Sequence, residues 1–301
     1  MAVTHLLGRC AAFALATGAA VVTATSASAA AAVGSDVTSN WAGYVSSAAL
    51  DPTTGLAGSF STVSGNWVQP AAKCASTVNS TSSAFWVGLG GDSDSANALE
   101  QIGTESDCTA SGAALYSAWY ELVPAASVKI GMKIAAGDKL SASVGVKGTK
   151  VSVKLSNLTT GKSFSRVLHM AAPDTTSAEW IAEAPSLCAS SDSSNCRQAS
   201  LTNFGKVSFS HASVTTPDGS TGTISDPAWS ATAVELDGSI ARGGFGRFTA
   251  ESGSEQALPG GLTGGGSAFT VRWRSVAATS PGSGYGSDPY GGDPYGYRGG
   301  Y

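Results

Sequence analysis

Apolar and polar residues alternate over many short stretches of this chain. In residues 116–123, for example, Trp119 and Glu121 would share one face of a strand and Tyr120 would lie on the opposite face. Glycine-containing turns separate these stretches, and no amphipathic helix of normal length is predicted between them. The stretches predicted as strands are 39–45, 60–68, 84–92 (running into a Gly-rich turn), 99–103, 116–123, 128–134, 140–146, 151–158, 163–170, 177–185, 205–212, 224 with its neighbours, 231–236 and 268–276.

This succession of strands indicates the fold class. Many short strands with turns between them, and no helical period, predict an all-β protein, either a sandwich or a barrel. The strands of the 151–158 and 163–170 region are expected to form an antiparallel meander. Residues 30–276 are predicted to form one β domain, and about 245 residues is an acceptable size for this class.

The two ends of the chain differ from the predicted β domain. Residues 1–29 have the pattern of a signal peptide, with Arg9 as the positive charge, an apolar run over 10–22 and Ala-Ser-Ala at 27–29 before the cleavage site. The mature protein is therefore expected to be secreted and extracellular. Residues 277–301 are rich in Gly, Tyr and Pro and contain Asp-Pro-Tyr-Gly twice, which predicts a disordered tail.

The stretch 177–185 carries an unusual pair of charges. Alternation places Glu179 and Glu183 on one face of the predicted strand and Trp180 on the other. Two carboxylates beside aromatic residues suit the floor of a cleft. The alternative is an exposed sheet face with two solvated acids, since surface acids are common.

Composition and charge exclude some functions. The chain of 301 residues is 42% hydrophobic but only 13% charged, and its formal net charge at pH 7 is -4. A nucleic-acid-binding protein needs a basic face, so this balance argues against a nucleic-acid partner. After removal of the signal peptide, no stretch is long and apolar enough to predict a membrane span.

The number of cysteines is consistent with the predicted secretion of the protein. Of the five cysteines, Cys10 leaves with the signal peptide, and four remain. An even number in an exported chain predicts two disulfides, for which three pairings are possible. We favour Cys74–Cys108 and Cys188–Cys196, because each pair brackets a locally connected segment.

Histidine-based and metal-based chemistry have little support. A serine or cysteine triad needs a histidine base, and only His169 and His211 remain in the predicted mature chain, each near the end of a predicted strand. There is no Cys-x-x-Cys and no His-rich motif, so neither a metal nor another cofactor is expected. Carboxylates in or beside aromatic strands remain as candidates: Asp92, Glu100, Glu121, Glu179 and Glu183. A carboxyl group desolvated near tryptophan can have a raised pKa and serve first as base and then as acid.

Several motifs, in the same order, resemble the glutamic endopeptidases, also called the eqolisin or peptidase G1 family. The resemblance spans residues 37 to about 275. The motifs are Ser39-Asn40-Trp41-Ala42-Gly43, Trp86-Val87-Gly88 with Gly91-Asp92, Leu99-Glu100-Gln101-Ile102-Gly103, Ala118-Trp119-Tyr120-Glu121, Ala136-Gly137-Asp138, Asn157-Leu158-Thr159-Thr160-Gly161, Ala178-Glu179-Trp180-Ile181 and Phe204-Gly205 before Val207-Ser208-Phe209.

The resemblance implies a fold, an activity and a catalytic pair. The family fold is an antiparallel β-sandwich of the concanavalin A-like lectin/glucanase type, with a cleft across one face. The family's glutamine and glutamate dyad falls on Gln101 and Glu179. Glu179 would take a proton from the attacking water and pass it to the leaving amine, and Gln101 would stabilise the oxyanion. An acidic pH optimum and insensitivity to pepstatin are expected.

The resemblance also implies how substrate is bound. Trp41, Trp119 and Glu121 are predicted to line the cleft, whereas Trp67 and Trp86, like Trp180, are assigned to the sandwich core. The expected partners are protein or peptide substrates, with no nucleic acid and no membrane after signal removal. The protein is expected to be a monomer.

Two alternatives stay open at this point. The same sandwich could be a lectin-like carbohydrate-binding module or a glycosidase, because one fold hosts many functions. Gln101 discriminates between them, since a glycosidase needs a second carboxylate where a peptidase needs an amide donor. The other alternative is an inactive wall-associated protein whose working part is the Tyr-rich segment 277–301.

Overall fold

The computed structural model of the chain describes residues 32–50, 55, 58–76, 79–92, 97–188, 196–239 and 255–275. The described residues form strands and contain no helix. None of them therefore lies in a helix long and apolar enough to cross a membrane. The predicted signal peptide 1–29 and the predicted tail 277–301 lie outside the described residues, and both stay predictions.

The strands match most of the stretches predicted from alternation. Their bounds are β1 (Val33–Thr38), β2 (Trp41–Ala48), β3 (Thr62–Val68), β4 (Ala84–Leu89), β5 (Leu99–Cys108), β6 (Ala114–Val123), β7 (Val128–Ile130), β8 (Lys139–Lys147), β9 (Lys150–Asn157), β10 (Lys162–His169), β11 (Ser177–Glu183), β12 (Ser186–Cys188), β13 (Cys196–Gln198), β14 (Lys206–Thr215), β15 (Thr221–Gly222), β16 (Trp229–Asp237), β17 (Glu255–Pro259) and β18 (Phe269–Ser275).

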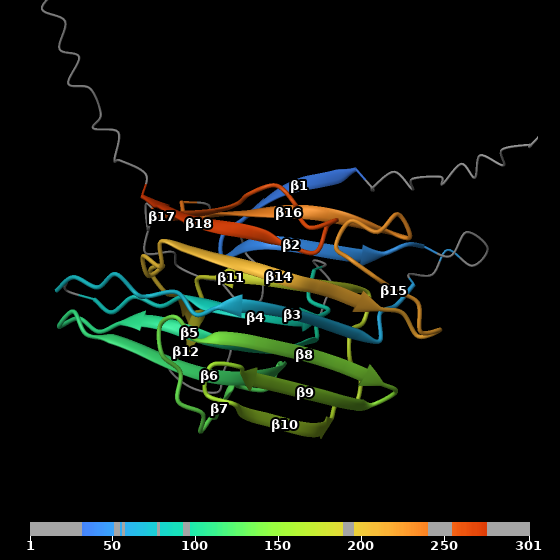
Figure 1. Cartoon of the computed structure of the whole chain (residues 1–301), viewed down its shortest axis with the longest axis horizontal. Helices are drawn as coiled ribbons and strands as arrows, with labels where there is room; N and C mark the ends of the chain where they lie inside the picture. Colours follow the sequence, from blue (N-terminus) through green and yellow to red (C-terminus); the bar gives the residue numbers. More distant parts are fainter. Residues whose placement is uncertain are drawn as a thin grey trace, which may run out of the picture.

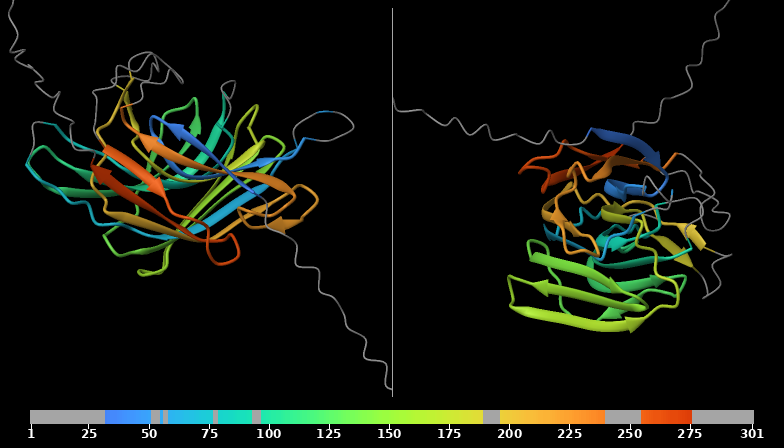
Figure 2. Two further views of the ribbon diagram at one scale, coloured as in Figure 1. Left: turned by 90° about the horizontal axis from the view of Figure 1, so that it is seen from above. Right: turned by 90° about the vertical axis from the view of Figure 1, so that its right-hand side faces the viewer.

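One continuous sheet folds back on itself to make two layers (Figures 1 and 2). Its path is β10-β9-β8-β3-β14-β18-β17-β16-β2-β11-β4-β5-β6-β7. Strands from the two ends of this path pack on each other: β4 contacts β3 and β8, and β5 contacts β8 and β9. We call β10-β9-β8-β3-β14-β18 the first layer and β2-β11-β4-β5-β6-β7 the second layer. This confirms the predicted all-β sandwich, which is antiparallel except that β1 joins β16 in parallel.

The core lies between the layers, and large aromatic side chains link them. Trp67 of β3 donates from Nε1 to Thr104 Oγ1 in the second layer, at 3.1 Å. Trp180 of β11 donates from Nε1 to the Ser64 carbonyl oxygen in the first layer, at 2.8 Å. Both indoles are buried, and a buried indole should have its N–H paired. The predicted assignment of these two tryptophans to the core is confirmed.

A second apolar cluster covers the opposite face of the second layer. Its buried members are Val45, Ala84, Trp86, Leu99, Trp119, Ile181 and Val234, and Trp41 and Val123 pack against them. As a result, β11 is buried on both faces over Ser177–Ala182, and β4 over its whole length. The alternation in 177–183 predicts only one covered face, so the expectation of an exposed face with solvated acids is wrong at Glu179.

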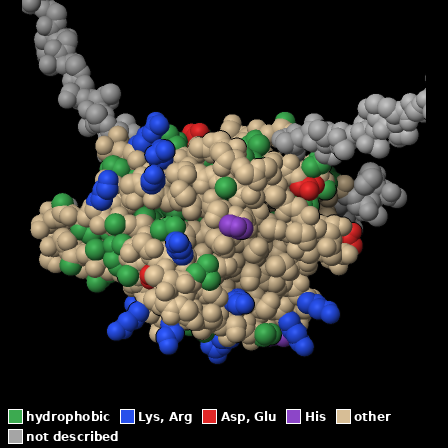
Figure 3. Space-filling model, viewed as in Figure 1, with side chains coloured by type: hydrophobic (Ala, Val, Ile, Leu, Met, Phe, Trp, Pro, Cys, Tyr) green, Lys and Arg blue, Asp and Glu red, His purple; other side chains and the backbone are tan. Residues whose placement is uncertain are grey.

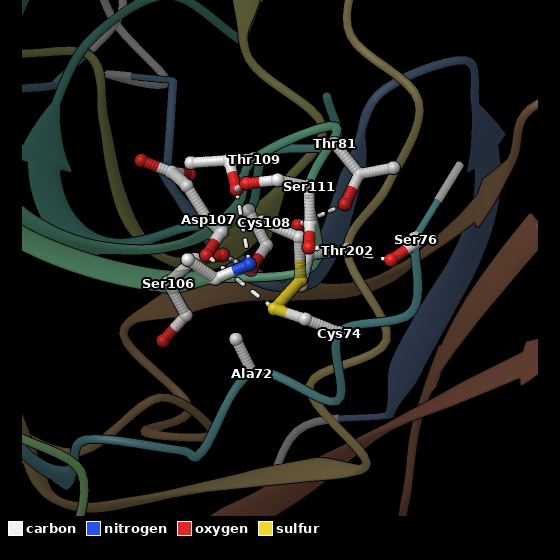
Figure 4. Close-up of a disulfide and its surroundings, with 12 residues drawn as sticks. Ala72, Cys74, Ser76, Thr81, Ser106, Asp107, Cys108, Thr109, Ser111 and Thr202 are labelled. Atoms are coloured by element: carbon white, nitrogen blue, oxygen red, sulfur yellow. Dashed lines mark hydrogen bonds between the residues drawn. A yellow bond between two sulfur atoms is a disulfide. The ribbon is translucent and has the colours of Figure 1, made fainter. Parts of the chain in front are cut away.

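A disulfide joins Cys74 to Cys108, one of the two pairs predicted from the sequence (Figure 4). It ties the loop after β3 to the end of β5, where Thr81 and Cys108 also pair as an isolated bridge. In the other predicted pair, β12 and β13 place Cys188 and Cys196 directly opposite each other along the backbone. Their side chains lie outside the described residues, so this second disulfide stays a prediction.

We expect removal of the first disulfide to destabilise the fold. The two cysteines are 34 residues apart, and closing a loop of that size in the unfolded chain is worth about 3–4 kcal/mol. The double substitution Cys74→Ser and Cys108→Ser should lower the free energy of unfolding in urea by this amount, with an unchanged fold by circular dichroism. A loss of less than about 1 kcal/mol would contradict this role.

Charge is divided between the two layers. The six strands of the first layer contain no Asp or Glu and carry all of these cations: Lys139, Lys147, Lys150, Lys154, Lys162, Arg166, Lys206, Arg272 and Arg274. Figure 3 shows Lys and Arg side chains gathered over the lower part of the molecule, where β8 to β10 lie. The acids of the second layer are instead Glu100, Glu105, Asp107, Glu121, Glu179 and Glu183. The second layer is therefore the place to look for carboxylate chemistry.

Candidate active site

Strand pairing brings the predicted catalytic residues into one row. Gln101 of β5 pairs with Glu121 of β6 on one side and with Gly88 of β4 on the other. Gly88 in turn pairs with Glu179 of β11. Directly opposed residues in antiparallel strands point to the same face, so all four share the outer face of the second layer. The sequence motifs that supply them are far apart, and only the register aligns them.

Gly88 separates Gln101 from Glu179, and the atoms packed around it leave no room for a larger side chain at this position. With strands about 4.8 Å apart, the two Cα atoms flanking Gly88 are about 10 Å apart, a distance that two long side chains can bridge. A Cβ at Gly88 would lie 2.9 Å from Trp86 Cζ3 and 3.1 Å from the Glu100 carbonyl oxygen. The predicted strand 84–92 is a strand only over Ala84–Leu89, and Gly88 lies inside it.

Glu179 is a buried carboxyl group without hydrogen-bond partners. Its exposed fraction is 0%, and neither of its carboxyl oxygens is bonded to another described residue. Burial raises the pKa of Glu179 well above 4.5, and the acids Asp92, Asp174 and Glu100 raise it further. The nearby Ser177 hydroxyl lowers it, although its geometry does not make a hydrogen bond to the carboxyl group. Both oxygens are therefore available to accept from a water molecule or a substrate group.

Gln101 is held from one side only. Its Nε2 donates to Glu121 Oε2 at 2.8 Å, while its buried Oε1 has no partner among the described residues. Burial raises the pKa of Glu121, although the bond from Gln101 opposes this effect. The sequence predicted Glu121 as a substrate-binding residue, and the structure places it directly against the predicted oxyanion donor.

The two predicted substrate-binding tryptophans lie on the same face as this row. Trp119 lies two residues before Glu121 on β6, on the same face, and is opposed by Gly103 of β5. Trp41 lies at the start of β2, and its ring packs edge-on against Trp86, with 5.1 Å between the ring centroids. Trp86 was predicted to lie in the sandwich core, but it belongs to the second cluster, because it shares the face of Gly88.

Glu183 is the second acid of β11, and its carboxyl group is bonded. Its Oε2 accepts from Trp86 Nε1 at 2.7 Å, and its Oε1 accepts from Asn40 Nδ2 at 3.2 Å. Desolvation nevertheless raises the pKa of Glu183 to about 8. Sequence alternation correctly put Glu183 on the face of Glu179, but it could not show that one acid is bonded and the other is not.

The raised pKa values predict that the fold is most stable in acid. Burial raises the pKa of Glu100 to about 8 and that of Asp107 to about 7, in addition to Glu179 and Glu183. A carboxyl group whose pKa is higher in the folded than in the unfolded protein favours folding fully when the pH is below its unfolded pKa. This contribution to the free energy of unfolding is lost as the pH rises through its folded pKa. Since one pKa unit is about 1.4 kcal/mol, several kcal/mol should be lost between about pH 4.5 and about pH 8.

Thermal unfolding followed by circular dichroism across this range checks the prediction. The melting temperature should fall steadily from about pH 5 to about pH 8. A melting temperature that rises over this interval would show that these carboxyl groups are ionised and well solvated in the folded protein.

The described residues also limit the cofactors to be considered. In this part of the chain, no three His, Cys, Asp or Glu side chains are grouped so that they could hold a metal ion.

The β-sandwich fold and the comparisons with known proteins define the class: this is a glutamic-type endopeptidase. Residues 39–240 match the model of the peptidase A4 family, and the chain belongs to this family, known also as the eqolisins. The lectin-like or glycosidase alternative has no support from this match.

Solved structures agree with the assignment. Scytalido-glutamic peptidase with a transition state analog inhibitor is 27% identical, with a TM-score of 0.58, over 78% of this chain and 98% of that one. SCP-B, an eqolisin in complex with the tripeptide Ala-Ile-His, is 26% identical, with a TM-score of 0.56 and the same coverage. A comparison with curated protein sequences gave no match.

Proposed function

We propose that this glutamic peptidase is a secreted enzyme that hydrolyses peptide bonds in acid with Glu179 and Gln101 as its catalytic residues. The observation that carries the proposal is the row in which Gly88 separates an unpaired buried carboxyl group from a buried amide. A glycosidase would need a second carboxylate at the position of Gln101, on the far side of Gly88 in the row, and an amide stands there instead.

The reaction uses the two side chains at different steps. Ionised Glu179 accepts a proton from a water molecule, whose oxygen forms a bond to the peptide carbonyl carbon. The carbonyl oxygen gains negative charge and receives hydrogen bonds from the Gln101 amide. Glu179 then gives its proton to the peptide nitrogen, the carbon–nitrogen bond breaks, and a carboxylic acid and an amine leave.

The pH dependence follows from the ionisation of Glu179. Only the ionised form can act as base, so kcat/KM falls as pH drops below the pKa of Glu179 in the free enzyme. Burial raises that pKa first of all, and the nearby acids Asp92, Asp174 and Glu100 add to it while they are charged. Burial also raises the pKa of Asp92 to about 6 and that of Glu100 to about 8, so these two acids are neutral at lower pH and no longer raise the pKa of Glu179.

Substrate binding is proposed for the aromatic residues around the row. Trp41 and Trp119 are on the face of Glu179, where flat rings can pack along an extended peptide. Because Glu179 is completely buried, a peptide can reach it only if groups above the row move aside. We propose that the substrates are unfolded proteins or peptides outside the cell, cleaved by a monomer.

Hydrolysis of an acid-denatured protein by the purified mature chain tests the proposal. We expect cleavage to peak below about pH 7 and to resist pepstatin, which inhibits peptidases that use a pair of aspartates. A peak at neutral or alkaline pH, or inhibition by pepstatin, would contradict the proposed chemistry.

A further inference from the structure

The Gln101 amide has two ends with opposite hydrogen-bonding character, and only one end has a partner. Nε2 donates to Glu121 at 2.8 Å, and Oε1 is buried without a partner among the described residues. Glu121 precedes Gln101 in the row and Gly88 follows it, so the atom not bonded to Glu121 points away from Glu121. The end left for the reaction is thus an acceptor, which would repel an oxyanion.

We propose that Glu121 is a positioning residue, which turns the Gln101 amide into its working orientation when its own carboxyl group is protonated. The inference rests on the proposed function of Gln101, and it adds that the protonation state of Glu121 determines whether the Gln101 amide can perform that function. Ionised Glu121 only accepts hydrogen bonds and must hold Nε2. Protonated Glu121 can donate to Oε1 instead, so the amide rotates by half a turn.

The rotation changes what the substrate meets. With Nε2 held by ionised Glu121, one N–H is used and the unpaired Oε1 lies beside it. With Oε1 held by protonated Glu121, both N–H groups of Nε2 are free to donate to the developing oxyanion. An unpaired buried acceptor also finds a partner, which favours this orientation in its own right.

The surroundings of Glu121 favour the protonated form. Desolvation raises its pKa, the bond from Gln101 and a bond from the Ser127 backbone lower it, and the nearby Glu105 carboxylate raises it. Glu183 of β11 also acts on Glu121 as a like charge. The cation on the neighbouring strand β7 is Lys129, which is exposed and pairs with Trp119 rather than with Glu121.

The proposal has a pH direction. As pH rises through the raised pKa of Glu121, its carboxyl group ionises and accepts a hydrogen bond from Gln101 Nε2. Gln101 Oε1 then faces the substrate. The kcat value should fall on this alkaline side, while the fold is still intact. The working orientation of the amide is therefore present at acidic pH. The loss of kcat at higher pH comes from ionisation of Glu121, whereas protonation of Glu179 lowers the rate at low pH.

Two matched variants test the inference through kcat. Glu121→Gln cannot ionise and can still bond either end of the Gln101 amide, so the alkaline fall in kcat, about tenfold or more in the wild type, should disappear. Glu105→Gln removes the neighbouring acid, whose own bond is to Ser117, and should leave an alkaline fall in place. Circular dichroism at each pH separates this effect from unfolding. An unchanged alkaline fall in Glu121→Gln would overturn the proposal.

A measurement independent of catalysis keeps the inference distinct from the proposed function. The side-chain amide signals of Gln101 in a 15N NMR spectrum can be identified by their absence in Gln101→Glu. In the Glu179→Gln background, these signals should shift with pH as Glu121 titrates, and they should stay constant when Glu121→Gln is added. Signals that do not move with pH in the presence of Glu121 would overturn the proposal, even if the peptidase activity is as proposed.

Discussion

The substitution Glu179→Gln should lower kcat for peptide hydrolysis by about 1,000-fold or more. The variant keeps the shape of the side chain but can neither take a proton from water nor return it to the leaving amine, and positioned acid–base catalysis is worth about 100- to 10,000-fold. The measurement is kcat with a fluorogenic peptide at the pH optimum of the wild type. A variant that keeps more than about a tenth of the wild-type rate would show that another carboxyl group acts as base.

Stability separates this loss of chemistry from misfolding. Glutamine at position 179 has no charge to bury, so the variant should be more stable than the wild type towards neutral pH, where the raised pKa of Glu179 costs stability. Glu183→Gln is the matched control, because Glu183 lies on the same strand and face and also has a raised pKa. It should gain stability in the same pH range and keep its activity within about tenfold of the wild type.

The second large effect is expected from Gln101→Ala. Removal of one oxyanion donor costs about 100- to 1,000-fold in kcat, because the donor acts on charge that develops in the transition state. The KM value should change little, since a neutral carbonyl oxygen gains less from the same bond. Steady-state kinetics at the pH optimum measure both constants. A rise in KM with an unchanged kcat would assign Gln101 to substrate binding alone.

The fold could be predicted where alternation is clean. The meander β8 to β10 has buried and partly or fully exposed residues in turn along β8 and β9, and the predicted ranges 140–146 and 151–158 differ from the observed strands by one residue at each end. The strand β17 was missed, because Glu255–Pro259 is short and ends in a proline that favours turns. The range 128–134 was too long, because only Val128–Ile130 pairs with β6.

The site was predictable only in part, and the reason is register. Motifs identified Gln101, Glu179 and Glu121 as separate residues, but no local pattern tells which residues of distant strands will oppose one another. The role of Gly88 between them is therefore visible only in the structure. In the same way, alternation put Glu183 on the correct face, while its bonds to Trp86 and Asn40 depend on how β11, β4 and the turn before β2 meet.

A crystal structure with a bound peptide-based transition state analog tests the central claim most directly. We expect the tetrahedral centre of the analog to lie above Gly88, with one oxygen within hydrogen-bond distance of Glu179 and the other within that distance of Gln101 Nε2. An analog whose tetrahedral centre bonds a different carboxyl group, such as Glu183, with Gln101 out of reach, would contradict the assignment of these two residues as the catalytic pair.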